Sequence, residues 1–367
     1  MKNNDYKVPD YSGACVNNIV PALLQYKEIG EGWIPEEILE SRQVVLLVID
    51  GLGYEQFIRH KDLFPCLSKF KTNDISTVFP TTTATALTSI TTGRSPGEHG
   101  MVGYKVRVAG QTLNALRWTT ESGPAHLDID PVHFQPIVPF LGSKPTVVSP
   151  AMFAESGFTA AHLRLSNYVG YSLPSSIGVE IGHAVRNGEP FVYAYYDGLD
   201  KIGHIKGFGD HYKAELRLID DLVKSITDTL PSGVALIVTA DHGMVQVGEN
   251  LISISKEVRN LTANVSGEAR FVWLHAEKGY AEDLFFAAKE AHGDVAWVLP
   301  VEQILEEGWF GHDVTDSARS RLGDVALVVR DSAALVLPEK PGPSLIARHG
   351  SITDEEARVP LLTLKLA

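Results

Sequence analysis

Carboxylate and imidazole side chains stand directly behind apolar segments at several points of the sequence. Asp50 follows the run VVLLVI, and the pair Asp241-His242 follows ALIVTA. An Asp-His pair placed there is hard to explain as structure alone, because both groups are costly to bury unpaired. Asp200 and His204 can share one side of a helical turn and hold one metal ion from one direction. The complete candidate set is Asp50, Asp200, His204, Asp241, His242 and His349.

These six side chains have the composition of a site for two metal ions. Three carboxylates and three imidazoles give each of two zinc-like ions three protein ligands and leave positions open for water or substrate. Two ions about 4 Å apart can contact both the attacking and the leaving oxygen of a phosphoryl transfer. Three Asp charges against two divalent ions leave a local charge of about +1. The set therefore predicts a site for an anionic phosphate ester.

A threonine cluster could supply the nucleophile for that reaction. Phe79 and Pro80 are followed by Thr81, Thr82 and Thr83 at the expected start of a helix. A threonine hydroxyl is a weak nucleophile unless metal coordination removes its proton. Backbone N–H groups at a helix start also face a bound phosphate. The same residue types suit helix capping, for which Thr81 and Thr82 are candidates.

Buried strands must position these side chains. Continuous apolar runs that do not alternate with polar residues are typical of strands buried on both faces of a parallel sheet. Helical patterns lie between them, so the expected fold class is α/β with a central mostly parallel sheet flanked by helices. Functional residues should then meet at the carboxyl ends of the strands. The expected strands cover residues 44–50, 145–151, 191–197, 234–243 and 324–331.

Two helices and one insertion complete the predicted organisation. Apolar residues recur at helical spacing over 216–230, and a short helix over 83–92 should end at Gly93. Residues 266–316 show a strand-helix-strand-helix pattern and are predicted to form a small α+β cap. The catalytic domain is then expected to comprise residues 1–265 and 317–367, with PEKPGP at 338–343 as a loop.

Composition restricts the class of protein. The chain has 367 residues, 44% hydrophobic and 21% charged, and a formal net charge of −13. Such an acidic surface argues against a protein that coats nucleic acid or binds anionic membranes. Two cysteines, Cys15 and Cys66, give no disulfide framework. No apolar leader precedes the first motif, and the longest aliphatic run has six residues, so we expect a cytoplasmic protein without a membrane span.

The order of these motifs resembles the alkaline phosphatase superfamily, and within it the type I phosphodiesterase/nucleotide pyrophosphatase branch. Asp-Gly after the first strand, Pro-x-x-Thr leading to Thr-Gly, Asp-x-x-x-His, Asp-His-Gly and a late His-Gly all occur in that order. The resemblance implies that Asp200, His204 and His349 hold one metal ion. It also implies that Asp50, Asp241 and His242 hold the other ion, with a nucleophilic threonine beside it. The metal in this branch is usually zinc.

Ungapped counting along the resemblance places the nucleophile at Thr83, with Thr82 as the alternative. The branch commonly carries an asparagine that donates to the transferred phosphate, and the same counting puts Tyr104 at that position. A tyrosine hydroxyl can donate a hydrogen bond but has a different reach. His99 is interpreted as structural, because it suits a residue that holds the loop before Gly100.

The sequence therefore predicts a two-metal phosphoesterase that uses Thr83 to hydrolyse phosphodiester or pyrophosphate bonds of a small molecule, possibly a nucleotide. The alternatives are a phosphomonoesterase or a phosphonate hydrolase. A phosphomutase is disfavoured, because its large inserted domain needs more than the roughly 50 residues of the expected cap. A non-catalytic metal-binding protein is also disfavoured, because binding alone would not require a nucleophile. The oligomeric state is not indicated.

Overall fold

The computed structural model describes residues 6–336 and 345–367, and the predicted loop at 338–343 lies outside them. In sheet order, the strands of the larger sheet are β2 (Lys71–Ser76), β19 (Arg358–Lys365), β10 (Ala235–Thr239), β1 (Val44–Ile49), β9 (Phe191–Tyr196), β7 (Thr146–Pro150) and β8 (Asn167–Tyr171). The five strands from β10 to β8 run parallel, whereas β19 pairs antiparallel with both of its neighbours, β10 and β2. The predicted α/β fold with a central mostly parallel sheet is confirmed.

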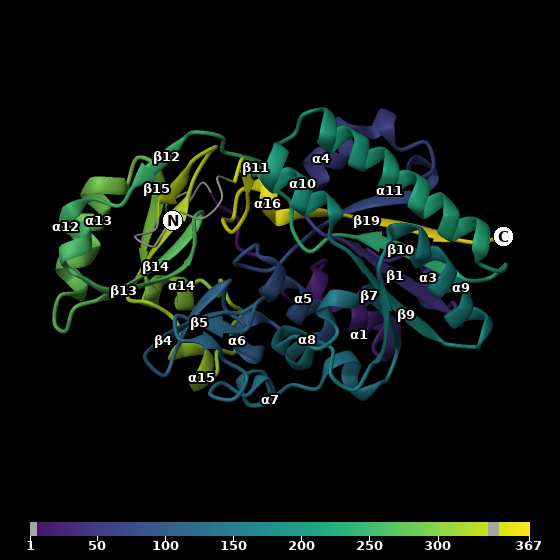
Figure 1. Cartoon of the computed structure of the whole chain (residues 1–367), viewed down its shortest axis with the longest axis horizontal. Coiled ribbons are helices and arrows are strands. Elements are labelled where there is room, and N and C mark those ends of the chain that lie inside the picture. The colour runs from purple at the N-terminus through teal and green to yellow at the C-terminus, as the bar shows by residue number, and fades with distance from the viewer. Residues whose placement is uncertain (1–5, 337–344) are drawn as a thin grey trace.

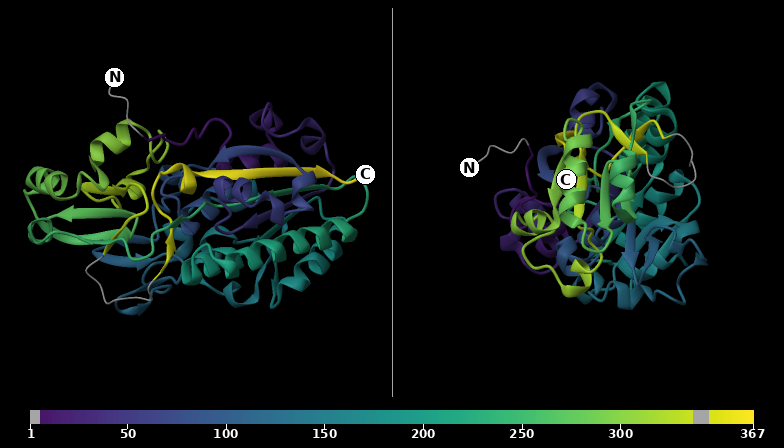
Figure 2. Two further views of the ribbon diagram at one scale, coloured as in Figure 1. Left: turned by 90° about the horizontal axis from the view of Figure 1, so that it is seen from above. Right: turned by 90° about the vertical axis from the view of Figure 1, so that its left-hand side faces the viewer.

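Helices cover both faces of this sheet, which is why its central strands contain only apolar and tyrosine side chains. Every residue of β1 and β9 is buried. Figure 2 shows α9 and α11 in teal on one side of the yellow strand β19, with segments from the first part of the chain on the other side. The helices around the sheet are α1 (Ile19–Leu24), α2 (Lys27–Gly30), α3 (Glu36–Leu39), α4 (Tyr54–Arg59), α5 (Thr83–Thr92), α6 (Pro96–His99), α7 (Pro131–Phe134), α8 (Gly157–His162), α9 (Ile177–Arg186), α10 (Gly198–Lys206), α11 (Asp210–Thr229) and α16 (Asp354–Ala357).

The two predicted helices form close to the expected residues. Helix α5 ends at Gly93, whose φ of 69° is left-handed, the conformation that glycine adopts without strain. Helix α11 ends at Thr229 and buries one apolar stripe that includes Leu216, Ile219 and Val223. The buried side chains of α5 place the start of this helix inside the core rather than at the surface.

A second sheet forms the other lobe, on the left in Figure 1. Side chains of its strands alternate between two environments, as strand geometry requires. Phe271 and Trp273 belong to the main core, whereas Val272 and Leu274 belong to a separate cluster. In sheet order its strands are β13 (Thr262–Glu268), β14 (Phe271–Ala276), β16 (Val325–Val329) and β15 (Ala296–Pro300). Its helices are α12 (Lys256–Asn260), α13 (Ala281–His292), α14 (Val301–Glu306) and α15 (Asp316–Arg319).

The interpretation of residues 324–331 as a strand of the central sheet is wrong. These residues do form a strand, β16, but it pairs with β14 and β15 of the second sheet. An apolar run shows that a strand is buried but not which sheet accepts it, so the pattern could not separate the two. The expected domain division at 266 and 316 stays a prediction, although β16 lies beyond its second boundary.

Three smaller sheets tie loops to the two lobes. Strands β11 and β18 join the segment after His242 to the segment before His349, through the register pair Val245 and Arg348. The small sheets comprise β11 (Val245–Gln246) with β18 (Ala347–Arg348), β12 (Leu251–Ser253) with β17 (Ala334–Val336), and the series β3 (Lys105–Val108), β4 (Gln111–Asn114), β5 (Thr119–Thr120) and β6 (Gly123–Pro124).

Among residues 6–336 and 345–367, no helix is long and apolar enough to cross a membrane.

Candidate metal centre

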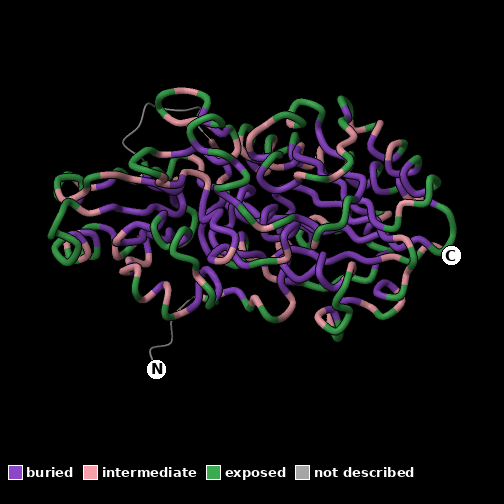
Figure 3. Tube along the Cα trace, turned by 90° about the horizontal axis from the view of Figure 1, so that it is seen from below, coloured by how far each residue is buried: buried purple, intermediate pink, exposed green. Residues whose placement is uncertain are grey.

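Three carboxylates meet at the carboxyl ends of neighbouring parallel strands. Asp50 directly follows β1, Asp200 lies in the first turn of α10 after β9, and Asp241 follows β10. Because β1 pairs with both other strands, the three segments reach the same edge of the sheet. Figure 3 shows that buried segments fill the middle of the trace and that exposed segments lie mostly at its outside, and Asp50 and Asp241 are among the buried residues. The parallel sheet therefore explains why residues so distant in the sequence converge.

One group of possible ligands consists of Asp50, Asp241 and His242. The candidate ligand atoms of the three residues lie within 4.8 Å of one another. His242 Nε2 is 3.4 Å from Asp50 Oδ1 and 3.4 Å from Asp241 Oδ2. This is the set that the sequence analysis expected around one ion, and the geometry brings all of it together.

A second group surrounds Asp200. The ligand atoms of Asp200, His242 and His349 also lie within 4.8 Å of one another. Asp200 Oδ1 is 3.7 Å from His349 Nε2, and Asp200 Oδ2 is 3.3 Å from His204 Nε2. The rings of His242 and His349 stack with centroids 3.8 Å apart, so His242 borders both groups. All six predicted ligands therefore form one continuous cluster.

The three imidazole rings are oriented by the same kind of backbone contact. Each Nδ1 lies against a backbone carbonyl: Ala347 for His204, Gly243 for His242 and Thr81 for His349, at 2.7, 3.0 and 2.8 Å. A carbonyl only accepts hydrogen bonds, so Nδ1 carries the proton and the Nε2 lone pair of a neutral ring faces the cluster. This orientation is typical of histidines that ligate metals.

The carboxylates leave buried oxygens without a hydrogen-bond partner. These atoms are Asp50 Oδ1, Asp200 Oδ1 and Asp241 Oδ2. Burial raises the pKa of Asp50 well above its usual range, and the negative charge of Asp241 raises it further, because two carboxylates repel each other in a buried site. Burial opposes ionisation of Asp200, but the nearby His204 and His349 outweigh it and lower the pKa of Asp200. Unpartnered, mutually repelling carboxylates beside three Nε2 atoms fit divalent cations.

Thr83 is the hydroxyl that faces this cluster. It is the first residue of α5, it is 6% exposed, and its Oγ1 lies 3.1 Å from His242 Nε2. Thr82 is the N-cap residue, without a side-chain capping bond.

Of the two N-cap candidates, Thr82 and not Thr81 occupies the N-cap position. Thr81 Oγ1 instead donates to the Ser351 carbonyl and accepts from the Gly350 N–H, at 2.7 and 3.0 Å. Thr81 is thus tied to the loop that carries His349, and it lies outside α5 because Thr82 is the N-cap residue.

Close backbone packing explains the glycine behind His242. A Cβ atom on Gly243 would lie 2.0 Å from the carbonyl oxygen of Glu355, so no larger residue fits there. The Gly243 N–H donates to the Glu356 carbonyl at 2.9 Å. The end of β10 is thereby fixed against α16, and the direction of His242 is fixed with it.

Two residues at the cluster were missed by sequence reasoning. The Tyr195 hydroxyl donates to Asp50 Oδ2, and Tyr195 sits on β9 opposite Val48 of β1. The sequence signal for Tyr195 was a tyrosine within a buried strand that pairs with the strand leading to Asp50. Glu268 of β13 lies 3.7 Å from His349 Nδ1, and burial raises the pKa of Glu268 to about 8. No local pattern marked Glu268, because its contacts come from far along the chain.

The remaining predicted residues lie as follows. Tyr104 Oη accepts a hydrogen bond from Asn114 Nδ2 at 2.7 Å. His99 Nδ1 accepts from the Met101 N–H at 3.0 Å, and His99 Nε2 lies 2.7 Å from Ser89 Oγ. His99 therefore links α5 to the following loop, as the structural interpretation expected.

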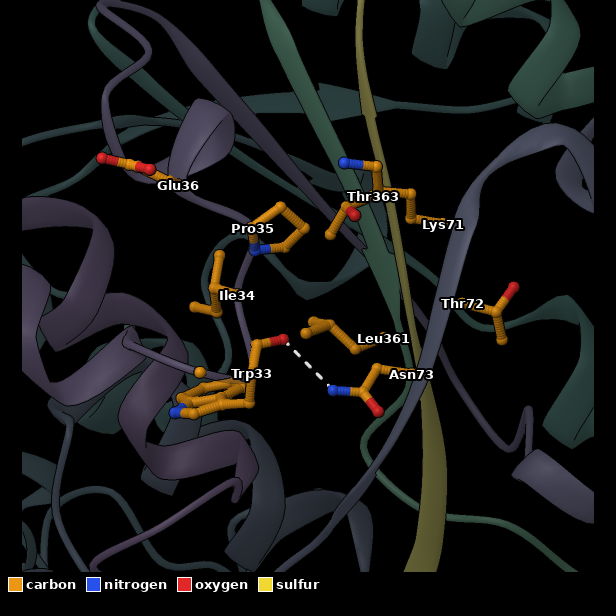
Figure 4. Close-up of a pocket in the computed structure, with 10 residues that line it drawn as sticks. Trp33, Ile34, Pro35, Glu36, Lys71, Thr72, Asn73, Leu361 and Thr363 are labelled. Carbon is orange, nitrogen blue, oxygen red and sulfur yellow. Dashed lines mark hydrogen bonds between the residues drawn. The ribbon is translucent and has the colours of Figure 1, made fainter.

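The pocket drawn in Figure 4 is separate from this centre. It has a volume of about 410 Å³ and lies at the edge of the central sheet, beside β2 and β19. Asn73 Nδ2 donates to the Trp33 carbonyl at 3.2 Å across it. Its lining residues include Lys71 and Leu361 but none of the six ligand candidates.

The fold is shared with solved structures of two kinds of hydrolase. Murine ectonucleotide pyrophosphatase/phosphodiesterase 5 superposes with a TM-score of 0.65 at 18% identity, covering 87% of each chain. An inactive variant of that enzyme in complex with AMP gives a TM-score of 0.66 at 18% identity, covering 88% of this chain and 87% of that chain. Phosphonoacetate hydrolase from Sinorhizobium meliloti 1021, in complex with phosphonoacetate, gives 0.63 at 17% identity, covering 88% and 90%.

The family assignment comes from the sequence itself. No curated protein matches the chain. The family model described as type I phosphodiesterase/nucleotide pyrophosphatase matches residues 44–352, a range that contains all six ligand candidates and Thr83. The predicted resemblance is confirmed, and the chain belongs to the type I phosphodiesterase/nucleotide pyrophosphatase family of hydrolytic enzymes.

Proposed function

We propose that this protein hydrolyses phosphodiester or pyrophosphate bonds of small molecules with two divalent ions, most simply zinc, and with Thr83 as nucleophile. The observation that carries the proposal is the position of the Thr83 hydroxyl, 3.1 Å from His242 Nε2 within a cluster of six possible ligands. Asp50, Asp241 and His242 would hold one ion. Asp200, His204 and His349 would hold the other.

The bound ions would supply Lewis acidity, which lowers the pKa of a coordinated hydroxyl or water and offsets charge on the phosphoryl oxygens. The residues of the chain position the nucleophile and the substrate phosphate. The start of α5 presents backbone N–H groups that have no partner within the helix, and these face an incoming phosphate together with the Thr83 side chain.

Two displacements then complete the reaction. Thr83 Oγ attacks phosphorus and its proton passes to solvent, while the ester oxygen of the leaving group departs with the bonding electron pair. The phosphothreonine is next attacked by water, which breaks the bond between phosphorus and Thr83 Oγ and restores the hydroxyl. Thr83 must lie in line with the leaving group in the first step, which its fixed place at the first residue of α5 favours.

A phosphonate hydrolase is the second candidate. The solved phosphonoacetate hydrolase has the same fold, and its printed ligand is a phosphonate rather than a nucleotide. Tyr104, at the position where the branch commonly has asparagine, also argues for a changed phosphate contact. A cytoplasmic location stays a prediction, supported by free Cys15 and Cys66.

A substrate panel with zinc tests the proposal. It should contain bis(p-nitrophenyl) phosphate, p-nitrophenyl phosphate, a dinucleotide pyrophosphate and phosphonoacetate. We expect the highest kcat/KM for a diester or pyrophosphate, and a phosphorylated or nucleotidylated peptide containing Thr83 after rapid quenching. A preference for phosphonoacetate would establish the second candidate. Isotope exchange between phosphate esters without net hydrolysis would indicate a mutase instead.

A further inference from the structure

The turn between β13 and β14 reaches from the second sheet into the metal centre. Glu268 ends β13 and pairs in register with Phe271, so residues 269 and 270 form a tight connection. Glu268 Oε2 lies 3.7 Å from His349 Nδ1. A Cβ atom on Gly350 would lie 2.8 Å from Glu268 Cδ, so the carboxyl group packs directly on the His349 loop. This turn is therefore a neighbour of one metal-ligand loop.

Arg270 in the same turn makes a fully buried ion pair with Glu356 of α16. Arg270 Nε and Nη2 donate to Glu356 Oε1 and Oε2, both at 2.8 Å, and both residues are 0% exposed. Arg270 also donates to the carbonyls of Val329 and Asp331. Figure 1 shows α16 at the junction between the two lobes. The planar guanidinium thus fixes α16 relative to the second sheet.

Glu356 also makes hydrogen bonds to the loop that carries His349. Its Oε1 accepts from the Ser351 N–H at 3.0 Å, and its Oε2 accepts from the Thr353 hydroxyl at 2.6 Å. The Ser351 hydroxyl donates to the carbonyl of Val329 on β16 at 2.6 Å. Residues 349–353 are therefore held by the second sheet on one side.

Thr81 holds the same loop from the other side. Its carbonyl accepts from His349 Nδ1, and its hydroxyl bonds both Gly350 and Ser351. The ligands Asp50 and Asp241 are anchored differently, because Asp50 directly follows β1 and Asp241 comes two residues after the end of β10, both in the central sheet. The direct contacts of the two carboxylates are therefore with the central sheet, whereas those of the His349 loop include the second sheet.

We propose that Glu268 and Arg270 are positioning residues for His349, so that metal binding at the Asp200/His204/His349 group depends on the second sheet more strongly than binding at the Asp50/Asp241/His242 group, which the same ion pair reaches only through the backbone contact of Gly243 with Glu356. The inference rests on the proposed ligand assignment. A buried ion pair alone is weak grounds for a stability role, because the cost of removing both charges from water offsets much of their attraction. The additional hydrogen bonds from Glu356 to the His349 loop indicate that the ion pair positions this loop. Glu268 packs its carboxyl group against the His349 ring and the Gly350 backbone, and loss of a residue that orients a metal ligand typically weakens metal binding by about 10- to 100-fold.

The test measures metal content rather than activity alone. Arg270→Lys and Glu268→Gln are dialysed against graded concentrations of a weak chelator, and zinc per chain is determined by elemental analysis. We expect wild type to hold two equivalents. Each variant should keep one equivalent at wild-type affinity and bind the second about 10-fold or more weakly. Two equivalents at unchanged affinity in both variants would overturn the inference.

Two controls make the result specific. Arg321→Lys alters another buried arginine, which binds the carbonyls of Gly100 and Phe134 and should leave both equivalents in place. His349→Asn should lose the same equivalent as Arg270→Lys, and the double variant should lose no more than the single variants. An additive loss would contradict a shared site.

Failure of the proposed function has a different signature. If wild type itself holds fewer than two equivalents, the two-metal assignment fails irrespective of the variants. If Arg270→Lys does not fold, Glu268→Gln decides the inference, because glutamine has the shape of glutamate and Glu268 makes no bond to Glu356 in the described contacts. Saturating zinc should restore kcat in both variants, which a merely misfolded protein would not show.

Discussion

Thr83 Oγ1 lies 3.1 Å from His242 Nε2, the same nitrogen that is 3.4 Å from Asp50 Oδ1 and 3.4 Å from Asp241 Oδ2. The hydroxyl and the three ligand atoms therefore enclose one small volume. A cation in that volume would contact the hydroxyl and both carboxylates at once. This arrangement distinguishes Thr83 from Thr81, whose hydroxyl bonds the His349 loop, and from Thr82, whose side chain makes no capping bond at the helix start.

The first prediction concerns the nucleophile. Thr83→Ala should lower kcat by several orders of magnitude, because no other hydroxyl occupies its position, whereas Thr83→Ser should keep part of the activity. Thr88→Ala is the matched control, since the Thr88 hydroxyl is also buried in α5 but bonds only the Ala84 carbonyl. Stopped assays and zinc content of each variant check this. An active Thr83→Ala enzyme, or an adduct on Thr82, would remove Thr83 from its role.

The second prediction concerns protons released by metal binding. Burial raises the pKa of both Asp50 and Asp241 in the metal-free protein, so these groups retain protons to higher pH than free aspartate. A metal must displace those protons, so zinc affinity should fall as the pH is lowered. Calorimetric titration in two buffers of different ionisation enthalpy measures the number of protons released. Zinc binding with no proton release at neutral pH would contradict the predicted shift.

The third prediction concerns Tyr195. Tyr195→Phe removes the hydroxyl that donates to Asp50 Oδ2 and should weaken zinc binding at that group by about 10- to 100-fold. Tyr196→Phe is the control on the same strand, because its hydroxyl donates to Glu215 on the opposite side of β9. Chelator competition on both variants compares them. Equal zinc affinity in the two variants would show that the Tyr195 contact does not tune the site.

The sequence was informative where a property depends on local pattern. Apolar runs predicted β1, β7, β9 and β10, and Gly93 predicted the end of α5. It was uninformative where the property depends on distant partners. Strand β2 (KTNDIS) is largely exposed and polar, so its place in the central sheet comes from pairing with β19 and not from its composition.

The same limit applies to the candidate site. Asp50, Asp241 and His242 could be found because each follows a buried strand. Glu268 reaches His349 only because β13 and the last loop of the chain are brought together by the fold, and no spacing records that contact. The choice between Thr81 and Thr82 as the N-cap residue could not be made for a related reason. The hydrogen-bond partners of Thr81, Gly350 and Ser351, lie close to the other end of the sequence.

The fourth prediction concerns stability against pH. Burial, with Arg321 nearby, lowers the pKa of His99 to about 3. In the unfolded chain His99 titrates near its ordinary value of about 6.5. Between these values the unfolded state binds the proton and the folded state does not. His99 therefore contributes stability above about pH 6.5 that is lost as the pH falls towards 3, at up to about 1.4 kcal/mol per pH unit.

Urea unfolding of His99→Gln checks this. The variant should be less stable than wild type at pH 7, and the difference should narrow steadily towards pH 4. His133→Gln is the control for the loss of a histidine at the surface, because the His133 side chain is 93% exposed. A constant difference between wild type and His99→Gln across this range would show that His99 does not titrate as predicted.

The fifth prediction concerns Tyr104 and its contact with substrate. Tyr104 Oη accepts from Asn114 Nδ2, so the proton of the tyrosine hydroxyl is free to be donated to a phosphate oxygen. Tyr104→Phe should lower kcat/KM by about 10-fold, the value of one hydrogen bond to a charged group, with stability nearly unchanged.

Asn114→Asp keeps an acceptor for the Arg117 N–H but replaces the donor with a carboxylate. The Tyr104 hydroxyl would then turn towards that carboxylate and away from substrate. Asn114→Asp should therefore lose as much kcat/KM as Tyr104→Phe, and the double variant no more than either. Full activity in Tyr104→Phe with both diester and phosphonate substrates would remove Tyr104 from the binding site.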